Sequence, residues 1–149
     1  MKTSSTAITF LAIAGTAIAA PANVERDLKP FQLTELNAGL YDQALPAYRI
    51  VNFKLNDPNN NIDTSCSSAW SGGMSGAYKF NCSNTDYQVN FPSLTDIEDI
   101  KLNVSIVNSK AFALGEINGD KWKCHNTGAE YPSKLCKYDG TYELPIVLA

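Results

Sequence analysis

The sequence has little histidine, no excess of basic residues and no long apolar run beyond its first twenty residues. Its 149 residues include a single histidine, His125, and 12 lysines and arginines against 15 acidic residues. The clustered lysines and arginines that bind nucleic-acid phosphates are missing, so we expect no nucleic acid among the partners. A membrane-spanning helix needs about 20 consecutive apolar residues. No later segment has them, and we expect no membrane insertion.

Catalytic patterns are also missing. A hydrolase triad would need His125 as its base, and His125 directly follows Cys124, which we expect to be in a disulfide. The nucleophile motif Gly-x-Ser-x-Gly does not occur. The acidic cluster of Asp96, Glu98 and Asp99 has the residue types of a glycosidase pair. Its members are sequence neighbours before a strand, however, so we interpret them as a solvated loop end. We therefore predict that the protein is not an enzyme and has no cofactor.

Metal ligands are only partly in place. Asp57, Asn59, Asn61 and Asp63 have the spacing of the first ligands of a calcium-binding loop. Ile62 stands where the sharp turn of such a loop needs glycine, and the bidentate glutamate is absent. The four cysteines form no Cys-x-x-Cys pair, which disfavours zinc. We interpret the segment as an asparagine-rich turn and predict no metal site.

A short apolar run lies at the start of the chain. Lys2 precedes the mostly apolar stretch 7–18, and Ala17-Ile18-Ala19 matches a small-x-small cleavage pattern. This layout is typical of a secretory signal peptide. We predict a signal peptide at residues 1–19, a flexible N-terminal arm at residues 20–30, and a secreted, extracellular mature protein.

Cysteine is scarce but even in number. The four cysteines, Cys66, Cys82, Cys124 and Cys136, all lie in the expected mature chain. An even number behind a signal peptide predicts two disulfides formed in an oxidising compartment. Of three connectivities we favour Cys66–Cys82 and Cys124–Cys136, because a local turn can bring each pair together. Closing loops of about 15 residues should stabilise the fold by roughly 3 kcal/mol each.

From Phe31 onward, apolar and polar residues alternate with a period of two. The clearest case is 100–107, where isoleucine, leucine, valine and isoleucine occupy every second position. Such alternation is typical of strands with one buried face. Asn118-Gly119 and Asp139-Gly140 favour tight hairpin turns between strands. We predict an all-β domain at residues 31–149, a compact antiparallel β-barrel or sandwich of about 7–11 short strands.

Three residues are candidates for modification or contact. Asn81-Cys82-Ser83 and Asn103-Val104-Ser105 are N-glycosylation sequons. Asn103 is the better candidate, because Asn81 adjoins a cysteine expected in a disulfide; an unmodified asparagine is the alternative at both positions. Trp70 is interpreted either as a core residue or as an exposed contact for sugar or protein. We expect the contact surface on the loops at residues 70–76 and 125–134.

The cysteine framework and its flanking strands resemble one known family. In chain order the resemblance is carried by Asn52-Phe53-Lys54-Leu55, Asp63-Thr64-Ser65-Cys66, Tyr78-Lys79-Phe80-Asn81-Cys82, Tyr87-Gln88-Val89-Asn90-Phe91, Ile100-Lys101-Leu102-Asn103-Val104, Ala113-Leu114-Gly115-Glu116, Cys124 and Cys136. These segments are similar in order and spacing to the Alternaria major-allergen-like domain of small secreted fungal proteins. That family includes plant cell-death elicitors and effectors. The resemblance covers roughly residues 31–149.

The resemblance implies an antiparallel β-barrel or sandwich with the same two disulfides. It also implies a non-enzymatic binding protein whose partner is an extracellular protein of a plant host or a small phenolic ligand. The allergen carries a further cysteine that links two chains. This sequence has none before Cys66, so we expect any homodimer to be non-covalent. We therefore expect a secreted, allergen-like fungal effector or elicitor that contributes to virulence. The alternative is a carrier of a small apolar or phenolic ligand.

Overall fold

A computed structural model describes residues 28–71, 78–92 and 96–148. The expected signal peptide and residues 20–27 of the expected arm lie outside these ranges. No helix in the described ranges is long and apolar enough to cross a membrane. The same ranges hold eleven strands: β1 (Phe31–Tyr41), β2 (Tyr48–Asp57), β3 (Ile62–Ser71), β4 (Tyr78–Asn81), β5 (Tyr87–Phe91), β6 (Ile100–Ile106), β7 (Ala111–Ile117), β8 (Trp122–Asn126), β9 (Lys134–Tyr138), β10 (Tyr142–Leu144) and β11 (Ile146–Leu148).

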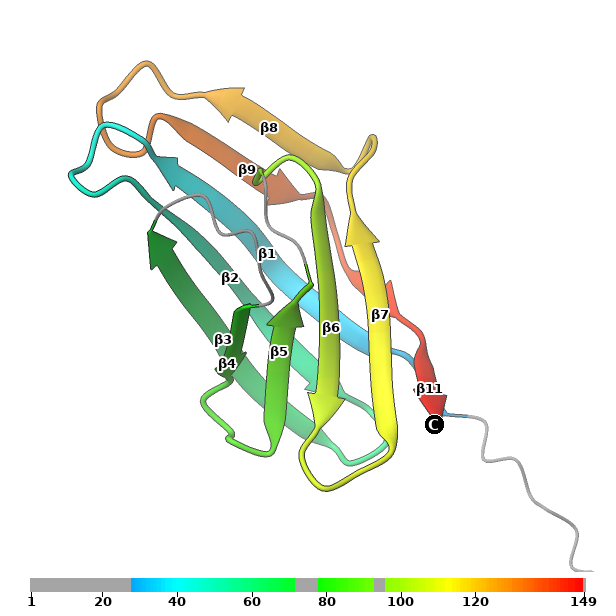
Figure 1. Cartoon of the computed structure of the whole chain (residues 1–149). Coiled ribbons are helices and arrows are strands. Elements are labelled where there is room, and N and C mark those ends of the chain that lie inside the picture. The colour runs from blue at the N-terminus through cyan, green and yellow to red at the C-terminus, as the bar shows by residue number, and fades with distance from the viewer. Residues whose placement is uncertain (1–27, 72–77, 93–95, 149) are drawn as a thin grey trace, which may run out of the picture.

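The strands form two antiparallel sheets that lie face to face (Figure 1). The six-stranded sheet has the order β3-β2-β1-β9-β8, and β10 pairs with the first residues of β1. The five-stranded sheet has the order β11-β7-β6-β5-β4. The prediction of an all-β antiparallel fold is confirmed, and its form is a sandwich whose two sheets are not closed into a barrel.

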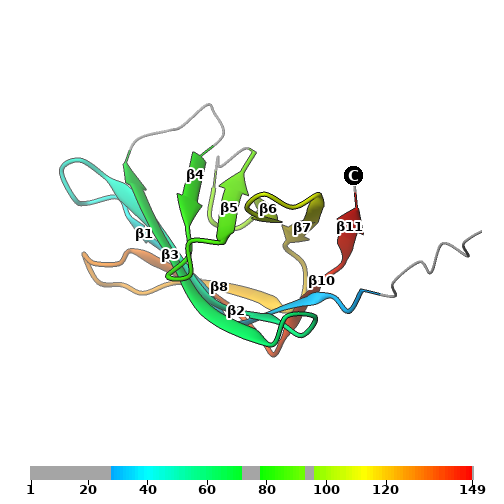
Figure 2. The same cartoon turned by 90° about the horizontal axis from the view of Figure 1, so that it is seen from below.

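The chain joins the two sheets along both sides of the sandwich (Figure 2). On one side it passes from β10 to β11 at Pro145, which has no N–H to continue a ladder. On the other side, the Cys66–Cys82 disulfide links β3 to the residue after β4. The Cys124–Cys136 disulfide joins directly opposite residues of β8 and β9 within one sheet. Both predicted disulfides are therefore present.

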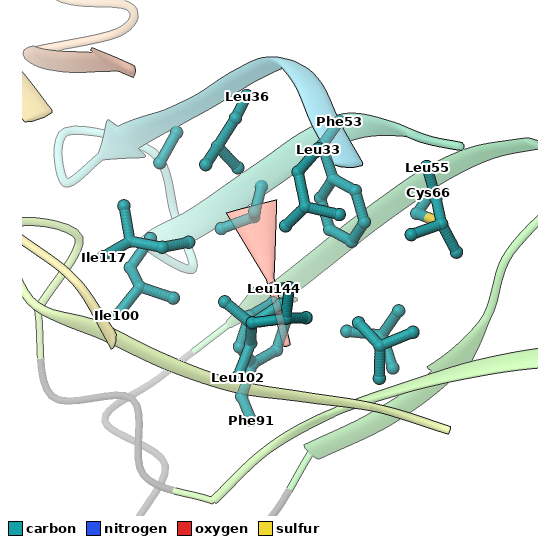
Figure 3. Packing of buried hydrophobic residues seen from close by; sticks show 14 of the residues in the cluster. Leu33, Leu36, Phe53, Leu55, Cys66, Phe91, Ile100, Leu102, Ile117 and Leu144 are labelled. Atoms are coloured by element: carbon teal, nitrogen blue, oxygen red, sulfur yellow. The ribbon is translucent and has the colours of Figure 1, made fainter. Parts of the chain in front are cut away.

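The core lies between the sheets and takes every second residue of most strands (Figure 3). In β6, for example, Ile100, Leu102 and Val104 are buried and point toward the six-stranded sheet. This is the alternation that the sequence showed, because successive side chains of a strand point to opposite faces. The largest fully buried side chains are Phe31, Phe91, Leu33, Leu36, Leu55, Ile97, Ile100, Leu102, Ile117, Leu144 and Val51.

Two predicted hairpins are wrong. Asn118-Gly119 connects β7 of the five-stranded sheet to β8 of the six-stranded sheet, so it is a crossing between layers. Asp139-Gly140 connects β9 and β10, which both pair with β1 and not with each other. Gly119 and Gly140 do have positive φ angles. The Asn-Gly and Asp-Gly pairs therefore predict a local turn conformation. The same conformation occurs in a hairpin and in a connection between two sheets.

Gly115 lies where β7 passes closely under β10. A Cβ atom added at Gly115 would collide with Leu144 Cδ1 and lie 2.9 Å from the Tyr142 hydroxyl. We expect Gly115→Ala to lower the free energy of unfolding by about 2 kcal/mol, because Leu144 is fully buried and has little room to move. Urea unfolding measures this value. Ala113→Gly on the same strand, which adds no atoms, is the comparison; an unchanged midpoint for Gly115→Ala would contradict the prediction.

Candidate binding surface

Trp70 is not an exposed contact. Only 4% of this residue is exposed, and its ring packs against Tyr78 and Phe91 at centroid distances of 6.1 and 5.9 Å. The alternation of β3 places Trp70 on the same inward face as Cys66 and Ser68. The exposed-contact interpretation is therefore wrong and the core interpretation is right. Residues 72–76 of the expected contact loop lie outside the described residues.

The other expected contact loop, residues 125–134, is at one end of the six-stranded sheet (Figure 1). There it meets the β1–β2 connection, residues 42–47. The Tyr131 hydroxyl donates a hydrogen bond to the carbonyl of Gln43 at 3.1 Å. The Ser133 N–H donates to the carbonyl of Leu40 at 2.9 Å. The first bond joins the two loops, and the second ties residues 127–133 to the end of β1. We call residues 42–47 and 127–133 the loop tip.

The loop tip presents two apolar side chains to solvent. Leu45 is 100% exposed and Tyr131 is 52% exposed. Burying one such side chain in a partner would release roughly 2 kcal/mol of hydrophobic free energy. Loops held on a rigid scaffold are common sites of recognition, and tyrosine is frequent among the residues that dominate binding. No sequence pattern pointed to Leu45, because the two loops are brought together by a bond between Gln43 and Tyr131, which are 88 residues apart.

Acidic side chains surround the loop tip. Asp42 and Glu130 are exposed on the tip itself. Lys134, next to the tip, donates a 2.6 Å hydrogen bond to Glu98. This bond raises the pKa of Lys134 above its ordinary value, and the charges of Asp96 and Asp42 add to the effect. Of the acidic cluster singled out in the sequence, Glu98 thus forms an ion pair. The loop tip therefore carries both exposed apolar side chains and exposed acidic side chains.

The remaining catalytic candidate, His125, is exposed on β8 opposite Leu135 of β9. It lies on the outer face of the six-stranded sheet, away from the sandwich interior.

The residues with the spacing of a calcium-binding loop do not converge. Asp57 is buried on the inner face of its strand, whereas Asp63 accepts a hydrogen bond from Asn56 on the outer face. In the described part of the chain, no group of three or more histidines, cysteines, aspartates and glutamates is placed to hold a metal ion.

Asp57 instead links the two sheets. Its carboxylate accepts hydrogen bonds from the Tyr87 hydroxyl at 2.8 Å, from Asn60 Nδ2 at 2.7 Å, and from the backbone N–H and Nδ2 of Asn59 at 2.9 and 3.1 Å. Burial acts to raise the pKa of Asp57, but these hydrogen bonds outweigh it and the pKa is lowered. Burial together with the Asp57 carboxylate raises the pKa of Tyr87 to about 12. No local pattern in the sequence indicated this pair.

The turn after Asp57 also holds the beginning of the domain. The Lys29 N–H donates to Asn59 Oδ1, and Asn59 Nδ2 donates to the Lys29 carbonyl, at 3.0 and 2.8 Å. Residues 28–30 of the expected flexible arm are therefore hydrogen-bonded to this turn. Beside them is an open groove of about 590 Å³, lined by Leu28, Asp57, Asn59, Asn60, Ile106, Ser109, Ala111, Ile146 and Leu148.

The two sequons differ in accessibility. Asn81 is exposed at the end of β4, where its Oδ1 accepts a 3.3 Å hydrogen bond from Gln88. Asn103 is half-buried in the middle of the five-stranded sheet between Asn90 and Leu114, and its Oδ1 is shielded from solvent. The structure therefore gives a glycan more room at Asn81, the reverse of the preference drawn from the sequence.

Comparison with known proteins yields no match: no family model, no curated protein sequence and no solved structure matches this chain. The resemblance to the Alternaria allergen family, and every function that follows from it, remains a prediction.

Proposed function

We propose that the protein is a secreted, non-enzymatic effector or elicitor that binds an extracellular protein of a plant host through the loop tip. The observation that carries the proposal is the fully exposed Leu45, which lies two residues from Gln43, the residue whose carbonyl accepts the Tyr131 hydrogen bond. Two disulfides support extracellular action, because disulfides persist in oxidising environments. The sequence resemblance to a family with elicitors supports the plant host.

The chemistry of the tip indicates the kind of partner surface. Leu45 and Tyr131 would fill an apolar pocket, and Asp42 and Glu130 would face basic residues around its rim. Such an arrangement, with apolar contacts at the centre and charges at the edge, is usual in protein interfaces. Because a hydrogen bond already joins the two loops, little conformational entropy would be lost on binding.

Infiltration of the purified mature protein into plant leaf tests the proposal. We expect cell death from the oxidised protein and none from a reduced and alkylated sample. The variant Leu45→Ser/Tyr131→Ser should need about thirtyfold more protein for the same response, because losing a central contact costs about 2 kcal/mol. Neither side chain belongs to the core, so far-UV circular dichroism should show an unchanged β-fold. Tyr131→Ser also removes the hydrogen bond from Tyr131 to Gln43 within the loop tip.

The matched control is Leu114→Ser/Val147→Ser. These side chains are 56% and 48% exposed and lie on β7 and β11, on the other sheet. We expect this control to act like the wild type. Equal loss of response in both variants, or an undiminished response from the loop-tip variant, would contradict the proposal.

A second function, transport of a small apolar ligand, is favoured by the groove beside Asp57. Leu28, Ile106, Ile146 and Leu148 supply apolar walls, and Asn60 and Ser109 supply polar groups that can orient a ligand. A carrier should bind the apolar dye anilinonaphthalene sulfonate in its folded state. Ile146→Asp should abolish that binding; dye binding that survives in Ile146→Asp would argue against the groove as the site.

A further inference from the structure

A pair of lysines lies on the outer face of the six-stranded sheet, away from the loop tip. Lys123 of β8 and Lys137 of β9 are directly opposite each other in register, and both are exposed. Neither is in any of the ion pairs found among the described residues. Like charges placed opposite each other destabilise a sheet. The pair therefore costs stability in a protein whose formal net charge is −3.

The two lysines begin a polar row that runs across five strands. Lys137 is opposite Asn37 of β1, Asn37 is opposite Asn52 of β2, and Asn52 is opposite Ser67 of β3. Adjacent strands lie about 4.8 Å apart, so the row is roughly 19 Å long. Figure 1 shows these five strands, β8-β9-β1-β2-β3, side by side behind the other sheet.

Hydrogen bonds fix the uncharged part of the row. The Ser67 hydroxyl donates to Asn52 Oδ1 at 2.6 Å, and Asn52 Nδ2 donates to Asn37 Oδ1 at 3.2 Å. Asn37 Nδ2 in turn donates to the carbonyl of Glu35 at 2.7 Å. Each amide nitrogen keeps a second N–H, and the Ser67 oxygen keeps its acceptor sites. The row thus presents oriented polar groups in addition to two positive charges.

A low apolar row runs beside the polar one. It consists, in register, of Leu135, Gly39, Ile50 and Ala69, and the exposed His125 of β8 lies at its end opposite Leu135. Gly39 has no side chain there, and the Tyr41 ring covers it, 3.0 Å from where a Cβ atom would be. Tyr41 stacks on Tyr48 with a centroid distance of 4.4 Å. The apolar row thus lies beside a stacked pair of aromatic rings.

We propose that this face binds an acidic polysaccharide, a chain of uronic-acid residues that lies across the strands. The sugar carboxylates would contact Lys123 and Lys137, and the hydroxyls would bond to Asn37, Asn52 and Ser67. The apolar faces of the sugar rings would lie on the neighbouring low row. This inference goes beyond the proposed function and uses a different surface.

The charge pattern of the face favours a polysaccharide over other anions. The Lys123–Lys137 pair lies at one end of the row, and three uncharged polar residues complete it, whereas a nucleic acid needs many phosphate contacts. A membrane surface favours apolar side chains that protrude into the lipid, whereas this row is polar. Of the acidic residues on the same face, Glu35 pairs with Lys54 at 2.6 Å and Asp63 accepts a hydrogen bond from Asn56. Glu143 lies opposite Gln32 at the beginning of β1, several residues along that strand from Asn37 and the polar row. Asp139 lies two residues beyond Lys137 and beside Lys121, to whose carbonyl its N–H donates at 2.9 Å.

Affinity electrophoresis in gels that contain polygalacturonate tests the proposal. The mature protein should be retarded by polygalacturonate and not by neutral dextran, and added salt should weaken the retardation. Lys123→Gln/Lys137→Gln should raise the dissociation constant roughly tenfold, as expected when two exposed charge contacts are lost. The matched control is Lys79→Gln/Lys110→Gln, which removes two other exposed lysines and should bind like the wild type.

Two further measurements separate binding from folding and sugar recognition from general anion binding. Lys123→Gln/Lys137→Gln should unfold at the same or a higher temperature than the wild type, because the repulsion is relieved. Asn52→Ala should weaken binding to polygalacturonate several-fold and leave binding to polyphosphate unchanged. Any one of three results would overturn the proposal. The first is equal retardation of the lysine variant and its control, and the second is unchanged polygalacturonate binding by Asn52→Ala. The third is lysine-dependent binding to phosphatidylserine vesicles without binding to polygalacturonate.

Discussion

Removing the Cys66–Cys82 disulfide with Cys66→Ala/Cys82→Ala is expected to lower the free energy of unfolding by about 3 kcal/mol. The disulfide spans 16 residues of sequence and links β3 of one sheet to the end of β4 in the other. Its loss raises the conformational entropy of the unfolded chain and also removes the covalent link between the two sheets on this side of the sandwich. Trp70 and Trp122 are both buried, so their fluorescence reports unfolding in urea.

Cys124→Ala/Cys136→Ala provides the comparison for this prediction. Its loop of 12 residues is of similar length, so the chain-entropy contribution is nearly the same. This disulfide joins β8 and β9 inside a continuous antiparallel ladder. At the other disulfide, the hydrogen bonds between the two segments include Ser83 N–H to the Ser65 carbonyl at 2.8 Å, Asn84 N–H to the Thr64 hydroxyl at 2.8 Å, and the Tyr78 hydroxyl to the Ala69 carbonyl at 3.3 Å. We therefore expect a smaller loss for Cys124→Ala/Cys136→Ala. If Cys124→Ala/Cys136→Ala lowers the free energy of unfolding as much as Cys66→Ala/Cys82→Ala does, the link between the sheets adds nothing to stability.

Asp57→Ala is expected to cost about 3 kcal/mol of unfolding free energy. The substitution leaves the buried Tyr87 hydroxyl without its charged acceptor, which is costly, and it also removes the acceptor of the Asn59 and Asn60 donors in the exposed turn. Thermal unfolding monitored by circular dichroism measures the effect. Asp63→Ala, which removes an exposed carboxylate with one hydrogen bond to Asn56, should change stability by less than about 0.5 kcal/mol. Similar losses of unfolding free energy in Asp57→Ala and Asp63→Ala would show that the hydrogen bonds of Asp57 do not stabilise the fold more than those of an exposed carboxylate.

The same pair predicts how stability depends on pH. Because the pKa of Asp57 is lowered from its ordinary value of 3.8, the folded state favours the carboxylate. Its contribution is complete above the pKa of the unfolded chain and is lost as the pH falls below about 4. The pKa of Tyr87 is raised to about 12, so the protonated phenol stabilises the fold until the pH rises from about 10 toward 12. Asp57→Ala should therefore lose less stability than the wild type both below about pH 4 and above about pH 10. Unfolding midpoints measured over this range of pH test the expectation.

Local sequence patterns predicted the strands and the disulfides because both depend on neighbours along the chain. The period of two in 100–107 reflects the geometry of a single strand, and it placed Ile100, Leu102 and Val104 on the buried face correctly. The cysteine pairs lie 16 and 12 residues apart, close enough for a local connection to be favoured. Trp70 was left open between core and surface, since the sequence does not show which face of β3 meets the second sheet.

The failures concern relations between distant segments. Asn118-Gly119 and Asp139-Gly140 specify turns, but the partner of the next strand is chosen by packing over the whole sandwich. Glycosylation of Asn103 stays a prediction, but the preference for Asn103 over Asn81 took no account of the flanking strands that half-bury it. Asp57 and Tyr87 are 30 residues apart and belong to different sheets.

By itself, the sequence determined that this chain is an all-β protein with two disulfides, since alternation and cysteine spacing act over short stretches of chain. Only the tertiary structure decided which surfaces are available for binding. Leu45 and Tyr131 lie on loops that are bonded to each other between Gln43 and Tyr131, and Lys123, Lys137 and Asn52 share a row because of strand register. Register and loop contacts depend on how the two sheets bury their apolar faces together, a condition that no single segment of the sequence contains.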